Sequence, residues 1–265
     1  MTVIVRRPAP PLRQLVRQIT YQAGEQPCTS VEKILPSPSA SLWVNLNRDE
    51  FRCLEGGRIL SIPGAMLAGP RSRPLVTEFE QGRAHVSVAF AAGAAASFFG
   101  PLTVTADELV PLELLWGRHG AVLREQLLAA GTPDAMLGVL EETLLRRVTG
   151  SGNADQAVAT AARELSGGKR VADVADGLGM LPRTLRRRFS AQIGLTPKRF
   201  ARVQRMQRVV RALDGHSQVN WCDVASEHGY ADQPHLTDEF RALADVTPRE
   251  YLRSRVDGPN HLTFP

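Results

Sequence analysis

The sequence predicts two domains, an N-terminal α/β domain of strands followed by helices and a C-terminal all-helical domain. Residues 33–47 and 83–93 alternate apolar with small or polar side chains, which is typical of β-strands. From about Gly120 onward, apolar residues recur at helical spacing instead. A short Gly/Ser tract at 149–153 separates two regions of different composition, and we place the domain boundary there.

The first domain, residues 1–150, is expected to end in two antiparallel helices joined by Gly131-Thr132-Pro133. The apolar stripes of these helices fit two surfaces. One is the strand layer of their own domain, and the other is a second copy of the chain, which predicts a homodimer. The stripes contain Val122, Leu123 and Leu127 on the first helix, and Leu137, Leu140 and Leu144 on the second.

Composition favours a binding protein of the reducing cytoplasm over an enzyme. The three cysteines (Cys28, Cys53, Cys222) form no CxxC pair and the six histidines show no metal-ligand spacing, so no metal or cofactor is predicted. No GxSxG, P-loop or GxGxxG motif is present, so no catalytic residue is predicted. The uncharged run 84–106 holds Gly, Pro and His with alanine as its bulk, which predicts a strand and a small-residue helix instead of a membrane span.

Positive charge is concentrated in one part of the chain. Residues 166–211 hold 12 Lys and Arg against 2 Asp and Glu, a net charge of +10, whereas residues 1–150 hold 15 against 14. Within this region Met180–Phe189 reads MLPRTLRRRF. In a helix, Leu185 and Phe189 share one face and three of the arginines share another. Such a surface attracts polyphosphate backbones, although an acidic protein, RNA or a lipid surface fits the same charge.

The C-terminal half contains an internal repeat with a period of 50 residues, rising to 51 after one inserted residue. Residues 171–200 align with 221–251 through several identical pairs, namely Asp173-Val174-Ala175 with Asp223-Val224-Ala225, Gly179 with Gly229, Leu185 with Leu236, and Phe189 with Phe240. A small alanine lets two helices cross closely, and glycine supplies the left-handed turn between them. The repeat therefore predicts two helix-turn-helix modules, at about 166–195 and 217–243.

A long helix at about 197–213 is expected to link the two modules. Its apolar stripe is predicted to pack on both of them, with Arg205 and Arg208 on roughly the opposite side. The stripe consists of Phe200, Val203, Met206, Val210 and Leu213. The helical domain then spans residues 151–256, and residues 257–265 are predicted to be a tail.

The motifs LPRTLRRRF, GLTPKRF, QRMQR and DVASEHGYADQPHLTDEFRALADVTPREYLR resemble the AraC/XylS family of transcription regulators over about residues 155–255. The segments ILP, GPRSRPL and VSVAFAAGAAASFFG resemble an uncharacterised domain that is often joined to such regulators. The resemblance implies double-stranded promoter DNA and RNA polymerase as partners. It also implies that a small-molecule effector or a dimer contact in the N-terminal domain controls DNA binding.

The resemblance further implies that LPRTLRRRF is the recognition helix of the first module. Arg183, Arg186 and Arg187 then fall at base-reading positions, with Thr184 beside them. An arginine fork suits the O6 and N7 atoms of guanine. Arg188 lies off this face, as a phosphate contact or a solubilising charge. The arginines of the linking helix are also expected to contact phosphates, and for Arg205 the family pattern offers a role in bracing the fold as the alternative.

The second module departs from this pattern, because residues 212–256 hold 4 Lys and Arg against 8 Asp and Glu, a net charge of −4. Asp232 is expected to cap its recognition helix. Three interpretations remain for the module: it recognises the N4 amine of cytosine through Asp238, it contacts its half-site loosely, or it stays off DNA until activated. The aligned positions are Gln233, His235, Thr237 and Asp238.

Two other interpretations of the N-terminal half remain open. Residues 1–150 would be an enzyme or a ligand-binding module, to which the DNA-binding half is regulatory. Trp43 in the first strand pattern is most simply a core residue, with a pocket wall as the alternative. The reading we adopt is a regulator that acts by binding.

Overall fold

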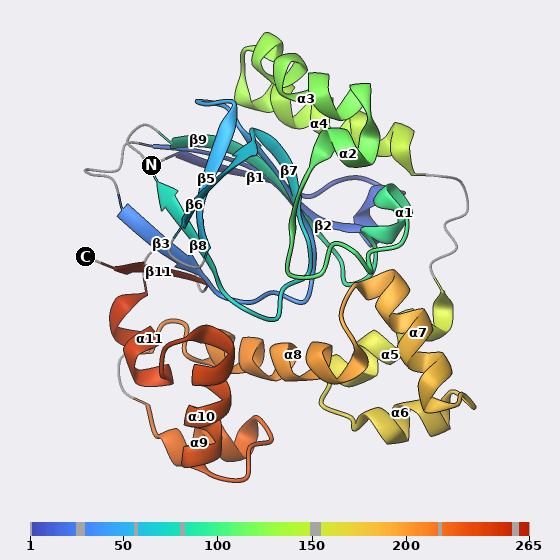
Figure 1. Ribbon diagram of the computed structural model, residues 1–265, viewed down its shortest axis with the longest axis vertical. Helices are drawn as coiled ribbons and strands as arrows, with labels where there is room; N and C mark the ends of the chain where they lie inside the picture. Colours follow the sequence, from blue (N-terminus) through green and yellow to red (C-terminus); the bar gives the residue numbers. More distant parts are fainter. Residues whose placement is uncertain are drawn as a thin grey trace.

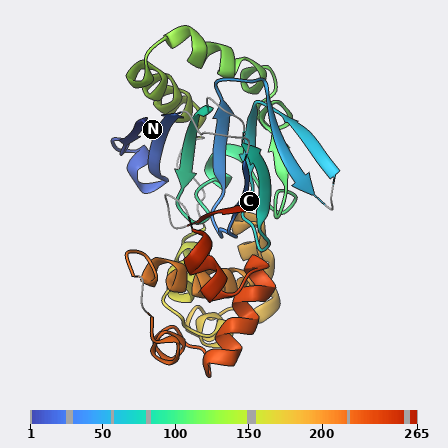
Figure 2. The same cartoon turned by 90° about the vertical axis from the view of Figure 1, so that its left-hand side faces the viewer.

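The computed structural model describes residues 2–24, 30–55, 58–79, 83–148, 155–216, 219–255 and 260–264. Two sheets and a layer of helices form the N-terminal domain, and seven further helices of the described chain lie at one end of it (Figures 1 and 2). The predicted fold class is confirmed. The tract 149–153, where we placed the domain boundary, lies outside the described residues.

The N-terminal domain contains two antiparallel sheets. The six-stranded sheet has the order β1-β2-β9-β4-β7-β10, formed by Thr2–Arg6, Val16–Gly24, Arg83–Phe90, Ser41–Asn45, Ala65–Ala68 and Leu109–Pro111. The five-stranded sheet has the order β11-β3-β8-β5-β6, formed by His261–Phe264, Ser30–Ile34, Leu75–Phe79, Glu50–Glu55 and Arg58–Pro63. The predicted strand region 33–47 is divided between β3 and β4, because Pro36 and Pro38 interrupt it.

One face of the six-stranded sheet packs against helices. The short elements are η1 (Leu12–Gln14), α1 (Ala96–Phe99) and α2 (Leu112–Trp116), and the long ones are α3 (Arg118–Ala130) and α4 (Pro133–Arg147). Thr132 caps α4 by accepting a hydrogen bond from the amide of Ala135. Because strand side chains alternate, every second residue of β4 and β9 meets this helical layer.

The leucines of the predicted stripes on α3 and α4 all lie in the core between these helices and the sheet. Leu123, Leu127, Leu137, Leu140 and Leu144 are fully buried there with Leu42, Val44, Val86 and Val88. The stripes therefore pack on the strands of their own domain. These leucines do not form the surface that we had considered for binding a second copy of the chain.

The C-terminal domain consists of two helix-turn-helix modules and a linking helix. Its helices are α5 (Gln156–Ser166), α6 (Val171–Gly177), α7 (Pro182–Ile193), α8 (Pro197–Ala212), α9 (Trp221–Glu227), α10 (Gln233–Ala244) and α11 (Pro248–Ser254). The two turn glycines are left-handed as predicted, with φ of 60° at Gly179 and 76° at Gly229. The stripe of α8 is fully buried and shared, since Phe200 joins the first module's core and Val203 the second's.

The end of the chain returns to the N-terminal domain. Residues 261–264, predicted only as part of a tail, form β11 and pair antiparallel with β3. Figure 2 shows this strand at the place where the two sheets of the N-terminal domain meet the helical domain. The local sequence pattern does not predict this pairing, because a four-residue strand next to β3 depends on contacts between residues about 230 positions apart.

Candidate DNA-binding face and ligand cavity

Helix α7 presents a cationic face to solvent. It starts at Pro182, a residue that favours the first helical position, and is followed by Gly194 at φ of 91°. Leu185 and Phe189 are fully buried in the first module's core. On the other side of the helix Arg183, Arg186 and Arg187 are exposed, and Thr184 beside them is half-buried. The amphipathic helix predicted for this stretch is confirmed, and its three arginines occur together on one accessible face.

Arg188 is placed differently from the other three arginines. Its Nε donates to the Asp155 carboxylate, which also caps α5 by accepting from the amides of Ala157 at 3.1 Å and Val158 at 3.3 Å. Burial by itself would raise the pKa of Asp155, but the hydrogen bonds from Arg188 and the α5 backbone outweigh it and lower that pKa. The described contacts of Arg188 thus connect α7 to the start of α5.

The corresponding residues of the second module are mostly engaged within their own helix. Asp232 caps α10 as predicted, by accepting from the His235 amide at 2.8 Å. The Nδ1 atom of His235 accepts from the amide of Ala231 at 3.2 Å, and the Thr237 hydroxyl donates to the Gln233 carbonyl at 3.0 Å. Gln233 is half-buried and Asp238 is exposed. The face of this helix is therefore less cationic and less free than that of α7.

Two arginines of α8 connect this helix to the second module. Arg205 donates to the Gly229 carbonyl at 2.9 Å, lies 3.0 Å from a Glu239 carboxylate oxygen, and covers the Tyr230 ring at 4.8 Å. Arg202 donates to the other oxygen of Glu239 at 3.0 Å. The contacts of Arg205 confirm the bracing role that the family pattern implied for it.

The second face of the six-stranded sheet, opposite the helices, is lined by polar side chains. It contributes Gln18, Thr20, Gln22, Ser41, Trp43, His85 and Ser87 to a cavity of about 530 Å³. Trp43 stacks on His85 at 4.9 Å between ring centroids, and its indole Nε1 donates to Ser41 at 2.8 Å. Because a sheet face that merely packed on another sheet would be apolar, this lining indicates a binding cavity. The alternative prediction for Trp43, a position in a pocket wall, is confirmed because Trp43 lines this cavity.

The five-stranded sheet and the chain end form the opposite wall of this cavity. Glu32 of β3 is 3% exposed, and its carboxylate lies 3.0 Å from the Nδ1 atom of His261. The cavity continues into a smaller apolar space of about 70 Å³. There the hydroxyls of Ser39 and Thr77 have no hydrogen-bond partner among the described residues. This site was not predicted from the sequence. The polar residues that alternate with apolar ones in SASLWVN and RAHVSVAF were the feature that pointed to it.

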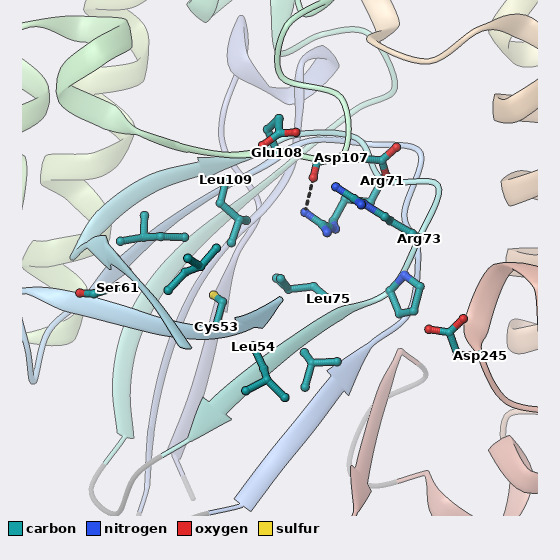
Figure 3. Close-up of a pocket in the computed structure, with 14 residues that line it drawn as sticks. Cys53, Leu54, Ser61, Arg71, Arg73, Leu75, Asp107, Glu108, Leu109 and Asp245 are labelled. Atoms are coloured by element: carbon teal, nitrogen blue, oxygen red, sulfur yellow. Dashed lines mark hydrogen bonds between the residues drawn. The ribbon is translucent and has the colours of Figure 1, made fainter. Parts of the chain in front are cut away.

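A second cleft, of about 400 Å³, opens between the sheets of the N-terminal domain and the second module. Figure 3 shows Arg71 and Arg73, both from the segment GPRSRPL, near Asp107, with Asp245 of the second module on the same side of the cleft as Arg73. Arg71 donates to the carbonyl of Asp107 at 3.0 Å. Two arginines and three carboxylates line this cleft, so its charge does not favour binding of an anionic ligand. Its floor is apolar and contains Cys53, Leu54, Leu75 and Leu109 (Figure 3).

Features of two further site classes are absent from the described part of the chain. No group of three or more His, Cys, Asp or Glu side chains there is arranged to hold a metal ion. Within the same described ranges, no helix is both long enough and apolar enough to cross a membrane. Paired helix-turn-helix modules, one with an exposed cationic recognition helix, define the class of DNA-binding proteins.

Comparison with known proteins places the chain within that class. Residues 174–254 match the family described as "Helix-turn-helix domain", and residues 5–111 match a domain of unknown function (DUF6597). The HTH-type transcriptional activator RhaS of Escherichia coli is 34% identical over 82 residues, which are 31% of this chain and 29% of RhaS. The chain therefore matches less than a third of the length of these curated relatives. The similarity to this activator lies in the C-terminal domain, which agrees with the resemblance to the AraC/XylS regulators that the sequence predicted for it.

Solved structures extend the similarity of fold to both domains. ToxT from Vibrio cholerae has a TM-score of 0.51 at 9% identity, covering 89% of this chain and 98% of that one. ToxT bound to (E)-4-(8-methylnaphthalen-1-yl)but-3-enoic acid has a TM-score of 0.50 at 11% identity, with the same coverage. At such low identity the similarity concerns the arrangement of the two domains.

Proposed function

We propose that this protein is a cytoplasmic transcription regulator that binds promoter DNA through its C-terminal domain. The observation that carries the proposal is the exposed cationic face of α7, opposite a fully buried core face. Arg183, Arg186 and Arg187 read base edges in the major groove from this face, with Thr184 beside them. A guanidinium can bond to two guanine atoms at once, which gives sequence preference as well as affinity.

Arg188 acts in this proposal through the fold. Its ion pair with Asp155 fixes the start of α5 against α7, and so orients the recognition helix. In the second module, Gln233 and Asp238 are the side chains best placed to meet bases, while His235 and Thr237 mainly support α10. The module then adds a loose contact to its half-site, because its acidic surface is repelled by phosphates.

We further propose that the cavity between the two sheets holds a small-molecule effector. Its hydroxyl, amide, imidazole and indole groups favour a polar molecule that forms several hydrogen bonds. The acid bound to ToxT has a large apolar ring system, so the effector of this chain differs from it in chemistry. RNA polymerase and a second copy of the chain are the proposed protein partners.

Selection of bound sequences from random duplex DNA tests the DNA-binding proposal. A defined motif should emerge with guanines at one or more positions, and its footprint should cover two successive major-groove segments, about 34 Å apart. Protection of one segment alone would show that the second module does not dock. Recovery of duplexes without any sequence preference would refute sequence-specific regulation.

A further inference from the structure

The C-terminal strand β11 belongs to both domains at once. It pairs with β3 from His261 opposite Ile34 to Phe264 opposite Val31. Leu262 in this strand is fully buried in the core of the second helix-turn-helix module, and Leu35 just after β3 joins the same core. Residues from outside the module's own helices therefore complete its core.

Hydrogen bonds connect the segment at the start of this strand to the linking helix. Gln207 of α8 is 5% exposed, and its side-chain amide donates to the Pro36 carbonyl at 2.7 Å and to the Asn260 side chain at 2.8 Å. The carbonyl of Asn260 accepts from the amide of Leu35 at 2.9 Å. Gln207 is buried whereas Asn260 is half-buried, so loss of the Asn260 side chain leaves the buried Gln207 amide with one partner fewer, at a cost.

Two residues of this C-terminal segment also form part of the cavity wall. Asn260 and His261 line the cavity together with Trp43 and His85. His261 is also a partner of the buried Glu32 carboxylate, on the strand with which β11 pairs. A molecule in the cavity therefore meets the segment that completes the second module.

The first module is joined to the N-terminal domain at a different place. The amide of Leu102 donates to the Ala191 carbonyl at 2.8 Å, and Gly194 lies so close to Pro70 that a β-carbon there would clash. No described residue of the first module lines the cavity. The described cavity wall therefore includes a segment that completes the core of the second module and no residue of the first module.

We propose that residues 260–264 are a strap that couples the cavity to the second module. This inference rests on the proposed function, because it names how the effector cavity controls DNA binding. A polar molecule that bonds to Asn260 and His261 binds only when the strap is in place, and so stabilises the docked second module. By linkage, displacement of the strap opens the cavity and loosens the module, while the first module keeps its position.

The three tryptophans allow the full chain to report on this coupling. Trp43 lines the cavity, Trp221 is the first residue of α9 in the second module, and Trp116 lies in the core under the helical layer. The protein would be labelled with 5-fluorotryptophan, and its fluorine NMR signals assigned by Trp→Phe variants. Hydrogen exchange would be followed in parallel on peptides from α5–α7 and from α9–α11.

The strap variant combines Asn260→Ala with His261→Ala. Both the Trp43 and the Trp221 signals should move, while the Trp116 signal stays in place and shows that the domain is folded. Exchange in α9–α11 should be about tenfold faster, since about two hydrogen bonds are lost, and exchange in α5–α7 should not change. His261→Gln, which keeps a hydrogen-bond donor toward Glu32, should restore most of the wild-type behaviour.

A matched control frays one turn of the second module without displacing the strap. Glu250→Ala breaks the capping box in the first turn of α11, whereas the other end of this helix leads to the Arg255 bridge with Leu262. Exchange should therefore rise in that first turn alone, while the strap stays in place and the Trp43 signal stays unchanged. A strap variant that moves only the Trp43 signal, or only the Trp221 signal, would show that the strap couples nothing. This arm contains no DNA, so it stands even if the chain binds none.

A second arm adds the duplex recovered by selection. In the wild type, DNA bound to the second module should shift the Trp43 signal through the strap, and the double variant should abolish that shift. A shift that persists in the double variant would overturn the inference while leaving DNA binding intact. Failure to bind any duplex would instead contradict the proposed function.

Discussion

The two helix-turn-helix modules share their buried positions and differ on the surface that would face DNA. Phe189 and Phe240 are aligned and both fully buried. The neighbouring surface positions have diverged, so that Arg187 of the first module corresponds to Asp238 of the second. The repeat thus preserves what the fold requires, namely core contacts and left-handed turns, and leaves the recognition surface free to change.

The modules also differ in what completes their cores. The second core includes Leu35 and Leu262, which come from the segment after β3 and from β11. At the edge of the first core, the half-buried Ala92 and Ala106 are the partly buried hydrophobic residues packed against it from the described part of the N-terminal domain. One module is therefore built into the N-terminal domain, whereas the other rests against it and presents the cationic helix.

The largest expected effect comes from the aligned phenylalanines. Phe189→Ala and Phe240→Ala should each lower the free energy of unfolding by about 3–5 kcal/mol, because both remove a fully buried ring. Their effects on DNA should differ, since Phe189→Ala should abolish specific binding and Phe240→Ala should shorten the footprint. Chemical denaturation and footprinting measure the two quantities. Equal loss of binding in both variants would contradict the unequal roles of the modules.

Arg205→Ala should act on the junction between α8 and the second module. The variant loses the bond to the Gly229 carbonyl, the pair with Glu239 and the contact with the Tyr230 ring, together worth about 2–3 kcal/mol. Melting temperature should fall, and protection of the second groove segment should weaken first. The exposed Arg211 on the same helix provides the control, since Arg211→Ala should leave the melting temperature nearly unchanged.

Arg187→Ala sharpens the comparison of the recognition helices. It should cost about 1–3 kcal/mol in binding the preferred site and relax the preference at one base position. Asp238→Ala, at the aligned position, should change affinity by less than about 1 kcal/mol, because the loss of a loose base contact and the removal of a charge that phosphates repel have opposite signs. Affinities for a panel of single-base variants measure both. A uniform loss on every sequence in Arg187→Ala would assign that side chain to phosphates.

Sequence patterns predicted most of the helical domain, because its features are local. The repeat located both turns, the stripe on α8 and the cap at Asp232, each of which depends on residues a few positions apart. Patterns did not predict β11 or the cavity, since both depend on distant pairings such as His261 with Glu32. The polar side chains of β4 and β9 were visible in the sequence. That they face a hollow interior becomes apparent only when the second sheet is in place.

The smallest expected effect concerns Arg188, the one arginine of the recognition helix that holds the fold. Arg188→Ala removes a partner of Asp155 but leaves the α5 amides bonded to it, so we expect a loss of about 1 kcal/mol in stability. Because the folded state lowers the pKa of Asp155, this carboxylate stabilises the protein above its ordinary pKa. That contribution disappears as the pH falls through the lowered folded value.

The pH profile separates this role of Arg188 from direct contact with DNA. Without Arg188 the folded pKa of Asp155 should rise toward the ordinary carboxyl value, and the variant should lose its acid stability at a higher pH than the wild type. The salt dependence of DNA binding should stay unchanged. Lys198→Ala, which removes an exposed cation of α8, provides the comparison for a phosphate contact and should reduce the salt slope by about 1. If Arg188→Ala instead reduced that slope and left the acid midpoint in place, Arg188 would belong with the DNA-facing arginines, and all four would act as one surface.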